Sequence, residues 1–284
     1  MSIILMTDSA ADYTAKEREE KNIIIVPLTV FVNDESFLDG YTIDAEGFYE
    51  KLSHGDCYPR TSQPSPELFL EHFNRAKENG DSVICINISS ALSGTYQSAM
   101  IAKDMAEYDN IYVLDSLLVA PAQRILVDHA KELIDSGMDF KAIVEELEEY
   151  KKRVRIFAIV DTLEYLKKGG RLSAAEAAIG ELVNIKPMIT ITEEGKLVSF
   201  GKALGKARAF KSLIKKFESA PADENFPLIF LHSSDEKGCL EFKNKFISAH
   251  PEQNIADFLV NLGPTVGSHT GPGVISIAYV MKKA

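Results

Sequence analysis

Short apolar runs alternate with amphipathic helical patterns along the whole chain, and no other feature restricts the fold as strongly. The apolar runs predict strands over residues 2–6, 23–30, 83–88, 111–114, 156–160, 188–191, 197–200, 228–232, 255–260 and 274–280. Apolar residues spaced three and four apart predict helices over residues 66–79, 121–136 and 140–154. Such alternation favours an α/β fold with a largely parallel sheet in the first half.

The sheet of the second half cannot be entirely parallel, because the short turn Glu193-Glu194-Gly195 joins two of its expected strands. We place a domain boundary near Arg155. The expected N-terminal domain, residues 1–155, is a mostly parallel, three-layer α/β domain with an excursion over residues 33–64. The expected C-terminal domain, residues 156–284, is an α/β domain with a mixed or antiparallel sheet. Since no long linker separates the two, we expect them to pack tightly.

Charge and cysteine content exclude several classes of protein. The net charge is −11, so nucleic acid would meet repulsion over most of the surface, and we expect no nucleic-acid partner. The three cysteines are scattered and form no C-x-x-C pair, which argues against a disulfide framework or a zinc cluster. Neither a signal-peptide pattern nor an apolar stretch of roughly 20 residues is present, so we expect a cytoplasmic protein.

Small polar residues follow three of the expected strands, at residues 7–9, 89–90 and 115–116. Ligands of open parallel sheets lie beyond the carboxyl ends of the strands, so these residues mark a candidate site. Ser93 lies between an expected strand and an expected helix, where a hydroxyl can donate to a carboxylate or a phosphate. The alternative is that these serines and aspartates only cap the following helices.

Three further segments carry candidate binding residues. Residues 61–65 (Thr-Ser-Gln-Pro-Ser) form a hydroxyl cluster stiffened by proline, although an ordinary turn would have the same composition. Residues 263–273 contain four glycines and two prolines, and His269 lies at their centre as a candidate donor. Arg171 follows Gly169-Gly170 and could pair with an anion or lie free on the surface.

An alanine-rich segment after Arg171 permits either close helix packing or a narrow apolar tunnel. Its small residues are Ala174, Ala175, Ala177, Ala178 and Gly180. Enzyme motifs are missing elsewhere, because Ser93 lacks the first glycine of G-x-S-x-G and no P-loop occurs. A serine- and histidine-dependent hydrolase, or a phosphoryl transferase acting on a small acidic substrate through Ser93 and His269, stays open as the alternative function.

Six of these segments, in this order, resemble the DegV family of bacterial fatty-acid-binding proteins, also called the fatty acid kinase B subunit. They are TDSAAD, RTSQPS, ISSALSGTYQSA, VDTLEYLKKGGRLS, NIKPMI and GPTVGSHTGPG. The resemblance implies a bound long-chain fatty acid, such as palmitate or oleate, and no cofactor. It places the carboxylate at the domain interface, near Thr61, its neighbour Ser62, Ser93, Arg171 and His269. The tail would lie in the C-terminal domain, where the alanine-rich segment would line a tunnel.

The resemblance also implies a lipid carrier and not an enzyme. A separate ATP-dependent fatty acid kinase would phosphorylate the bound acid to an acyl phosphate. One departure concerns Leu204, which stands where relatives commonly have a basic residue. This departure bears on contact with the kinase or the membrane more than on the fatty acid site. We expect at most transient contact with a membrane surface, through a patch formed by Lys202, Lys206 and Arg208.

Overall fold

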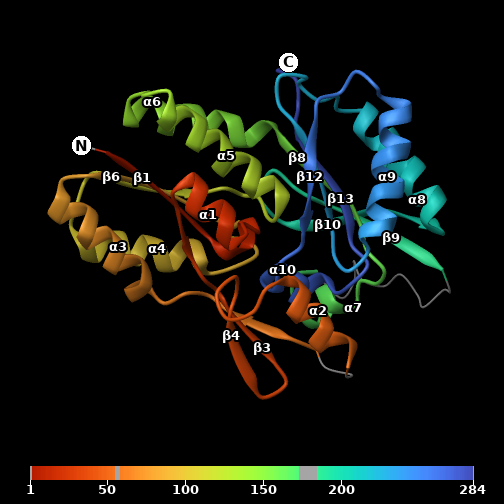
Figure 1. Cartoon of the computed structure of the whole chain (residues 1–284), viewed down its shortest axis with the longest axis horizontal. Coiled ribbons are helices and arrows are strands. Elements are labelled where there is room, and N and C mark those ends of the chain that lie inside the picture. The colour runs from red at the N-terminus through yellow and green to blue at the C-terminus, as the bar shows by residue number, and fades with distance from the viewer. Residues whose placement is uncertain (1, 55–57, 173–183, 284) are drawn as a thin grey trace.

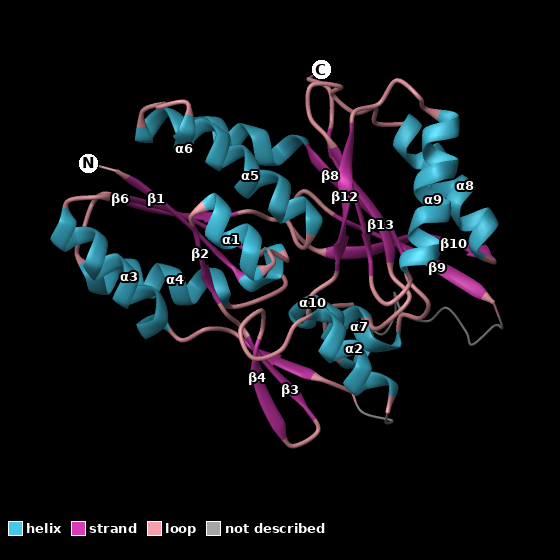
Figure 2. Ribbon diagram, in the orientation of Figure 1, coloured by secondary structure: helices cyan, strands magenta, loops and turns pink. Residues whose placement is uncertain are grey.

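The computed structural model describes residues 2–54, 58–172 and 184–283, and its strands form three sheets (Figures 1 and 2). The first half contains a parallel sheet and the second half a mixed sheet, so the fold is the two-domain α/β arrangement that the alternation predicts. A small antiparallel sheet lies below both (Figure 2).

The parallel sheet has the strand order β2-β1-β6-β7. Its strands are β1 (Ile3–Asp8), β2 (Ile23–Val26), β6 (Ser82–Asn87) and β7 (Ile111–Asp115). Every residue of β6 is buried, because helices cover both faces of the sheet. One face packs on α3 (Pro66–Asn79) and α4 (Thr95–Ala106), and the other packs on α5 (Pro121–Asp135) and α6 (Phe140–Tyr150). The first half therefore has the predicted three layers.

The second sheet has the order β10-β9-β8-β13-β11-β12, and only the β11–β12 pair is parallel. Its strands are β8 (Val154–Ile159), β9 (Ile185–Ile191), β10 (Leu197–Leu204), β11 (Leu228–His232), β12 (Ile255–Asn261) and β13 (Ile275–Val280). Aromatic side chains pack its outer face against α8 (Lys206–Glu218) and α9 (Glu236–Ala249). The β9–β10 hairpin closes at the predicted turn.

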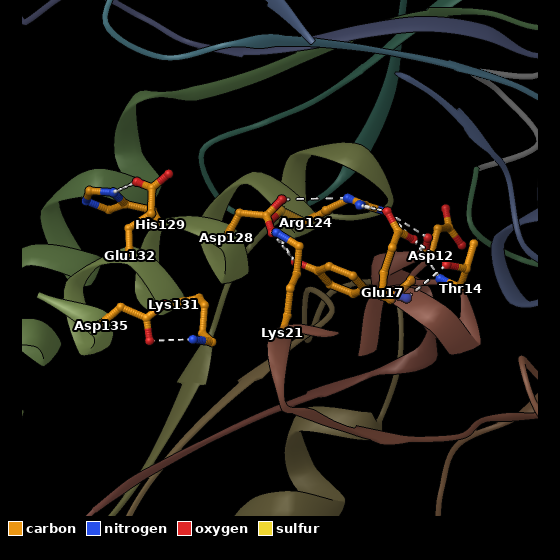
Figure 3. Close-up of polar contacts among 11 residues, drawn as sticks. Asp12, Thr14, Glu17, Lys21, Arg124, Asp128, His129, Lys131, Glu132 and Asp135 are labelled. Atoms are coloured by element: carbon orange, nitrogen blue, oxygen red, sulfur yellow. Dashed lines mark hydrogen bonds and ion pairs between the residues drawn. The ribbon is translucent and has the colours of Figure 1, made fainter. Parts of the chain in front are cut away.

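Helix α5 lies between the two large sheets and belongs to the core of both (Figure 1). Ile84 of β6, Leu126 of α5 and Ala278 of β13 are part of one continuous apolar cluster. The first turn of α5 is tied to α1 (Ala15–Lys21), because Arg124 forms an ion pair with Glu17 (Figure 3). The two halves therefore share one core and not only an interface.

The small sheet has the order β4-β3-β5, with β3 (Thr29–Val32), β4 (Glu35–Leu38) and β5 (Arg60–Ser62). Helix α2 (Ala45–Ser53) packs on it around Val30 and Phe48. The remaining helices are short: 3₁₀ turns at Ser9–Ala11 and Lys151–Arg153, α7 (Glu164–Lys168) and α10 (Pro264–Thr270). Figure 1 shows α7 and α10 close to the small sheet, below the mixed sheet.

Three sequence predictions about these elements were wrong. Residues 23–30 are not one strand, because the chain leaves the parallel sheet after Val26; the next residue, Pro27, has no N–H to donate to a ladder. The helix expected over residues 140–154 ends at Tyr150, and Val154 already begins β8. The segment 263–273, for which the sequence predicts no helix, contains α10, which begins with Pro264 in the first turn.

Candidate functional site

An apolar cavity lies between the inner face of the mixed sheet, the start of α5 and the helix α10. The space between its protein atoms is about 800 Å³, part of it open to solvent. Leu28, Ile88 and Val119 line it from the first half of the chain, and Ala158 and Ile189 line it from the second.

Four of the five predicted site residues, Thr61, Ser93, Arg171 and His269, line this same cavity. Thr61 comes from β5 and His269 from α10, and their Oγ1 and Nε2 atoms are 2.8 Å apart although 208 residues separate them in sequence. Ser62 is exposed, does not line the cavity, and directs its hydroxyl to the carbonyl of Gln63 (3.4 Å).

Ser93 lies just before α4, as expected from its position between a strand and a helix. Its Oγ accepts a hydrogen bond from the backbone N–H of Thr95 (3.3 Å) and is 2.8 Å from the Thr95 hydroxyl. The Ser93 hydroxyl therefore has a local capping role and still faces the cavity.

Arg171 connects the end of α7 with the loop that carries Ser93. Its Nε donates to the carbonyl of Leu92 (3.0 Å) and its Nη1 to the carbonyl of Gly169 (2.6 Å). No carboxylate in residues 2–54, 58–172 or 184–283 forms an ion pair with it, and half-burial lowers the pKa of its guanidinium. A cation fixed by backbone carbonyls beside the cavity is suited to an anionic ligand.

His269 is mostly buried, and burial together with the charge of Arg171 lowers the pKa of its imidazole to about 4. The ring is therefore neutral at pH 7. Its Nδ1 faces Gly169, where an added Cβ would overlap the ring, and this atom has no hydrogen-bond partner among the described residues. A catalytic triad needs a serine on one ring nitrogen and an acid on the other. Here Nε2 meets Thr61 and Nδ1 meets no acid.

The polar end of the cavity also borders a second pocket nearer the surface. Thr61, Arg171 and His269 line both, and exposed Arg60 and Lys168 line only the outer one. A ligand group held by the three shared residues is therefore adjacent to a basic, accessible space.

Sequence reasoning missed the carboxylates that hold α10 in place. Asp12 Oδ1 accepts from the backbone N–H of Gly263 (3.0 Å), and Asp39 Oδ2 accepts from that of Thr265 (3.2 Å). Burial raises the pKa of Asp39 to about 6. Asp8, noted at a strand end, accepts from the backbone N–H of Ile88 (2.7 Å), so its role is structural and not in the cavity.

Comparison with known proteins decides the family. Residues 2–282 match the family model described as an uncharacterised protein of the DegV family. The chain belongs to the DegV family. A DegV domain-containing protein of Halalkalibacterium halodurans is 34% identical over 287 residues, which cover 99% of both chains.

Solved structures of other DegV proteins share this fold along their whole length. A DegV family protein from Thermus thermophilus, described by its fatty acid binding, has 34% identity and a TM-score of 0.89, over 99% of this chain and 100% of that one. A stearic-acid-binding protein from Eubacterium ventriosum has 27% identity and a TM-score of 0.88, over 99% of each chain. These structural neighbours bind fatty acids.

Two other kinds of feature are absent from the described part of the DegV chain. Across the described helices, none is long and apolar enough to cross a membrane. Within the same residues, no three His, Cys, Asp or Glu side chains are grouped so that they could hold a metal ion. The alanine-rich segment, for which the sequence predicts a tunnel-lining role, lies outside the described residues.

Proposed function

We propose that this DegV protein binds a long-chain fatty acid, such as palmitate or oleate. The carboxylate would lie among Thr61, Ser93, Arg171 and His269, and the tail would lie along the inner face of the mixed sheet. The observation that carries this proposal is the convergence of these four polar side chains on a mostly apolar cavity between the two halves. The fatty acids bound by the structural neighbours support it.

The energetics of such a ligand match the two parts of the cavity. Burial of each methylene contributes about 0.8 kcal/mol, so a long tail contributes on the order of 10 kcal/mol before the cost of ordering it. A carboxylate that leaves water must keep hydrogen bonds or an opposite charge. The hydroxyls of Thr61 and Ser93 and the guanidinium of Arg171 would supply both.

We propose further that the protein is a carrier and that a separate ATP-dependent kinase acts on the bound acid. One carboxylate oxygen would attack the γ-phosphorus of ATP, so that an acyl phosphate forms and ADP leaves. The outer pocket beside Thr61, Arg171 and His269 supports this proposal, because it would let a partner reach the carboxylate. The sequence has no P-loop of its own.

Contact with a membrane would be brief in this proposal. Leu204, in the place of a common basic residue, is 49% exposed at the end of β10. Lys206 forms an ion pair with Asp235, and Lys202 and Arg208 are exposed. Two exposed cations on a chain of net charge −11 would bind an anionic surface weakly.

Native mass spectrometry of protein purified without added lipid tests the binding proposal. We expect a bound acid of the palmitate or oleate class, and reduced occupancy in a Thr61→Val, Ser93→Ala double variant. Protein that is folded and empty, and that takes up neither palmitate nor oleate, would refute the proposal. Hydroxylamine trapping after addition of ATP and a candidate kinase tests the second step, because it converts an acyl phosphate to a hydroxamate.

A further inference from the structure

The end of the cavity away from His269 is closed by aliphatic side chains on three neighbouring strands. Phe157 of β8 pairs with Thr190 of antiparallel β9, so Ile156 lies opposite Ile191. Leu197 of β10 pairs with Ile191 in turn. Ile156, Ile191 and Leu197 therefore form one row across β8, β9 and β10, and all three line the cavity.

This row faces the same side of the sheet as the middle of the cavity. Side chains alternate between the faces of a sheet, so Ile156 lies on the face of Ala158, and Ile191 on that of Ile189. Ala158 pairs with Ser276 of β13, and both line the cavity. Ala158 and Ser276 thus leave room beside Ile189 in the middle of the cavity floor, and the β-branched Ile156 and Ile191 stand at its end.

Beyond the row lies another pocket, of about 900 Å³ including open solvent. Ile156 and Ile191 line both this pocket and the apolar cavity. The far pocket is more polar than the cavity, because Lys151, Lys152 and Arg155 line it together with Leu117 and Leu118. The two isoleucines are therefore the wall between an apolar space and a more polar one.

The wall and the polar residues lie at opposite ends of the cavity. The cavity shares three lining residues with the outer pocket, namely Thr61, Arg171 and His269. It shares two others with the far pocket, Ile156 and Ile191. Along β8, Ile156 is three residues before Ile159, or about 10 Å at the rise of a strand, and α7 follows beyond that end. A tail that starts near Arg171 and follows β8 would therefore point its methyl end at Ile156.

We propose that Ile156 and Ile191 set the maximum length of the acyl chain that this protein accepts. The proposal rests on the proposed function, since it assumes a bound fatty acid. The methyl end of the chain stops against the two side chains. A longer chain would have to displace them and to enter a more polar pocket, where its last methylenes gain less burial than in the cavity.

Competition between saturated acids of different lengths tests the proposal. The full chain, delipidated, is offered an equimolar mixture of acids with 14 to 22 carbons, and the bound acids are quantified by mass spectrometry. Ile191→Ala and Ile156→Ala remove the wall and let a longer tail pass. In the space that the isoleucine leaves, each newly buried methylene favours binding about fourfold, so preference for acids two carbons longer rises about fifteenfold.

Matched variants separate a length limit from a general loss of packing. Ile159→Ala makes the same substitution on β8, three residues from Ile156, but Ile159 packs on the outer face of the sheet and lines neither the cavity nor the far pocket. It leaves the order of preference unchanged. Ile191→Phe keeps the wall and enlarges it, so it shifts preference to shorter acids.

The outcomes distinguish the length limit from the proposed function. Wild-type length ratios in Ile191→Ala, Ile156→Ala and Ile191→Phe, with binding retained, overturn the length limit and leave fatty acid binding intact. An equal shift in Ile159→Ala also overturns it, because the loss of any isoleucine from the sheet would then have the same effect. A wild-type protein that binds none of the acids rejects the proposed function together with the limit.

Discussion

Replacement of His269 by alanine removes the imidazole that meets Thr61 at the polar end of the cavity, where the two atoms are 2.8 Å apart. In the proposed complex the neutral ring donates to the fatty acid carboxylate, either directly or through the Thr61 hydroxyl. A hydrogen bond to a charged group contributes about 1.5–3 kcal/mol, so we expect His269→Ala to weaken binding about tenfold to hundredfold. Titration calorimetry with oleate at pH 7.5 measures this change.

Two variants sharpen this experiment. His269→Gln keeps an amide donor near the position of Nε2, so it should recover part of the affinity. His129→Gln is the matched control, because His129 stacks on Tyr150 with ring centroids 3.8 Å apart and does not line the cavity. Binding of oleate by folded His269→Ala within twofold of wild type would refute the role assigned to the ring.

The same histidine makes the unliganded protein sensitive to acid. Its pKa falls from 6.5 to about 4 on folding, so below pH 6.5 the unfolded chain binds a proton that the folded chain excludes. This contribution to stability is complete above pH 6.5 and is lost as the pH falls to about 4. The displacement corresponds to on the order of 3 kcal/mol. Urea unfolding of wild type and His269→Gln at pH 7.5 and 4.5 should show a smaller loss in the variant.

Other substitutions should have the following effects. The pKa of Asp39 is raised from 3.8 to about 6, so the free energy of unfolding falls as the pH rises from about 4 to about 6. Asp39→Asn should flatten the dependence of this free energy on pH, measured by urea unfolding. An unchanged slope of free energy against pH in the variant would contradict this prediction. Gly195 and Gly137 both have positive φ, but only at Gly195 would a Cβ meet Ser89 and the Leu117 backbone. Gly137→Ala should cost about 1 kcal/mol and Gly195→Ala clearly more, and equal melting temperatures would exclude this contact. Arg171→Lys keeps the charge but not the two-carbonyl geometry, so it should bind oleate more weakly than wild type and more tightly than Arg171→Met; equal affinities of the two variants would show that the charge has no part.

Much of the fold could be predicted because both large sheets have strands that are continuous apolar runs. The failures occurred where tertiary contacts decide. Pro27 divides one apolar run between two sheets, β2 in the parallel sheet and β3 in the small antiparallel sheet. Which sheet the second part joins depends on contacts with residues that are distant in sequence. Helix α10 forms from a glycine-rich segment because Asp12 and Asp39, more than 200 residues earlier, cap its first N–H groups.

The candidate site could be predicted in part. The motifs that resemble the DegV family include Thr61, Ser93, Arg171 and His269, and the structure brings these four to one cavity. Ser62 follows Thr61 in the same motif, but its side chain lies on the opposite face of β5, because successive side chains of a strand alternate between the two faces. The wall of Ile156 and Ile191 has no sequence signal, because it depends on the register between β8 and β9.

The position of α5 between the two large sheets limits how this chain can be divided. A gene fragment that ends near residue 155 would encode α5 with the face that contacts β8 and β13 left uncovered. The fragment that begins there would lack the helix that covers its sheet. Because α5 packs on both sheets, neither piece is expected to fold alone, and an exchange of halves between such proteins would have to preserve the contacts of α5 with the second sheet.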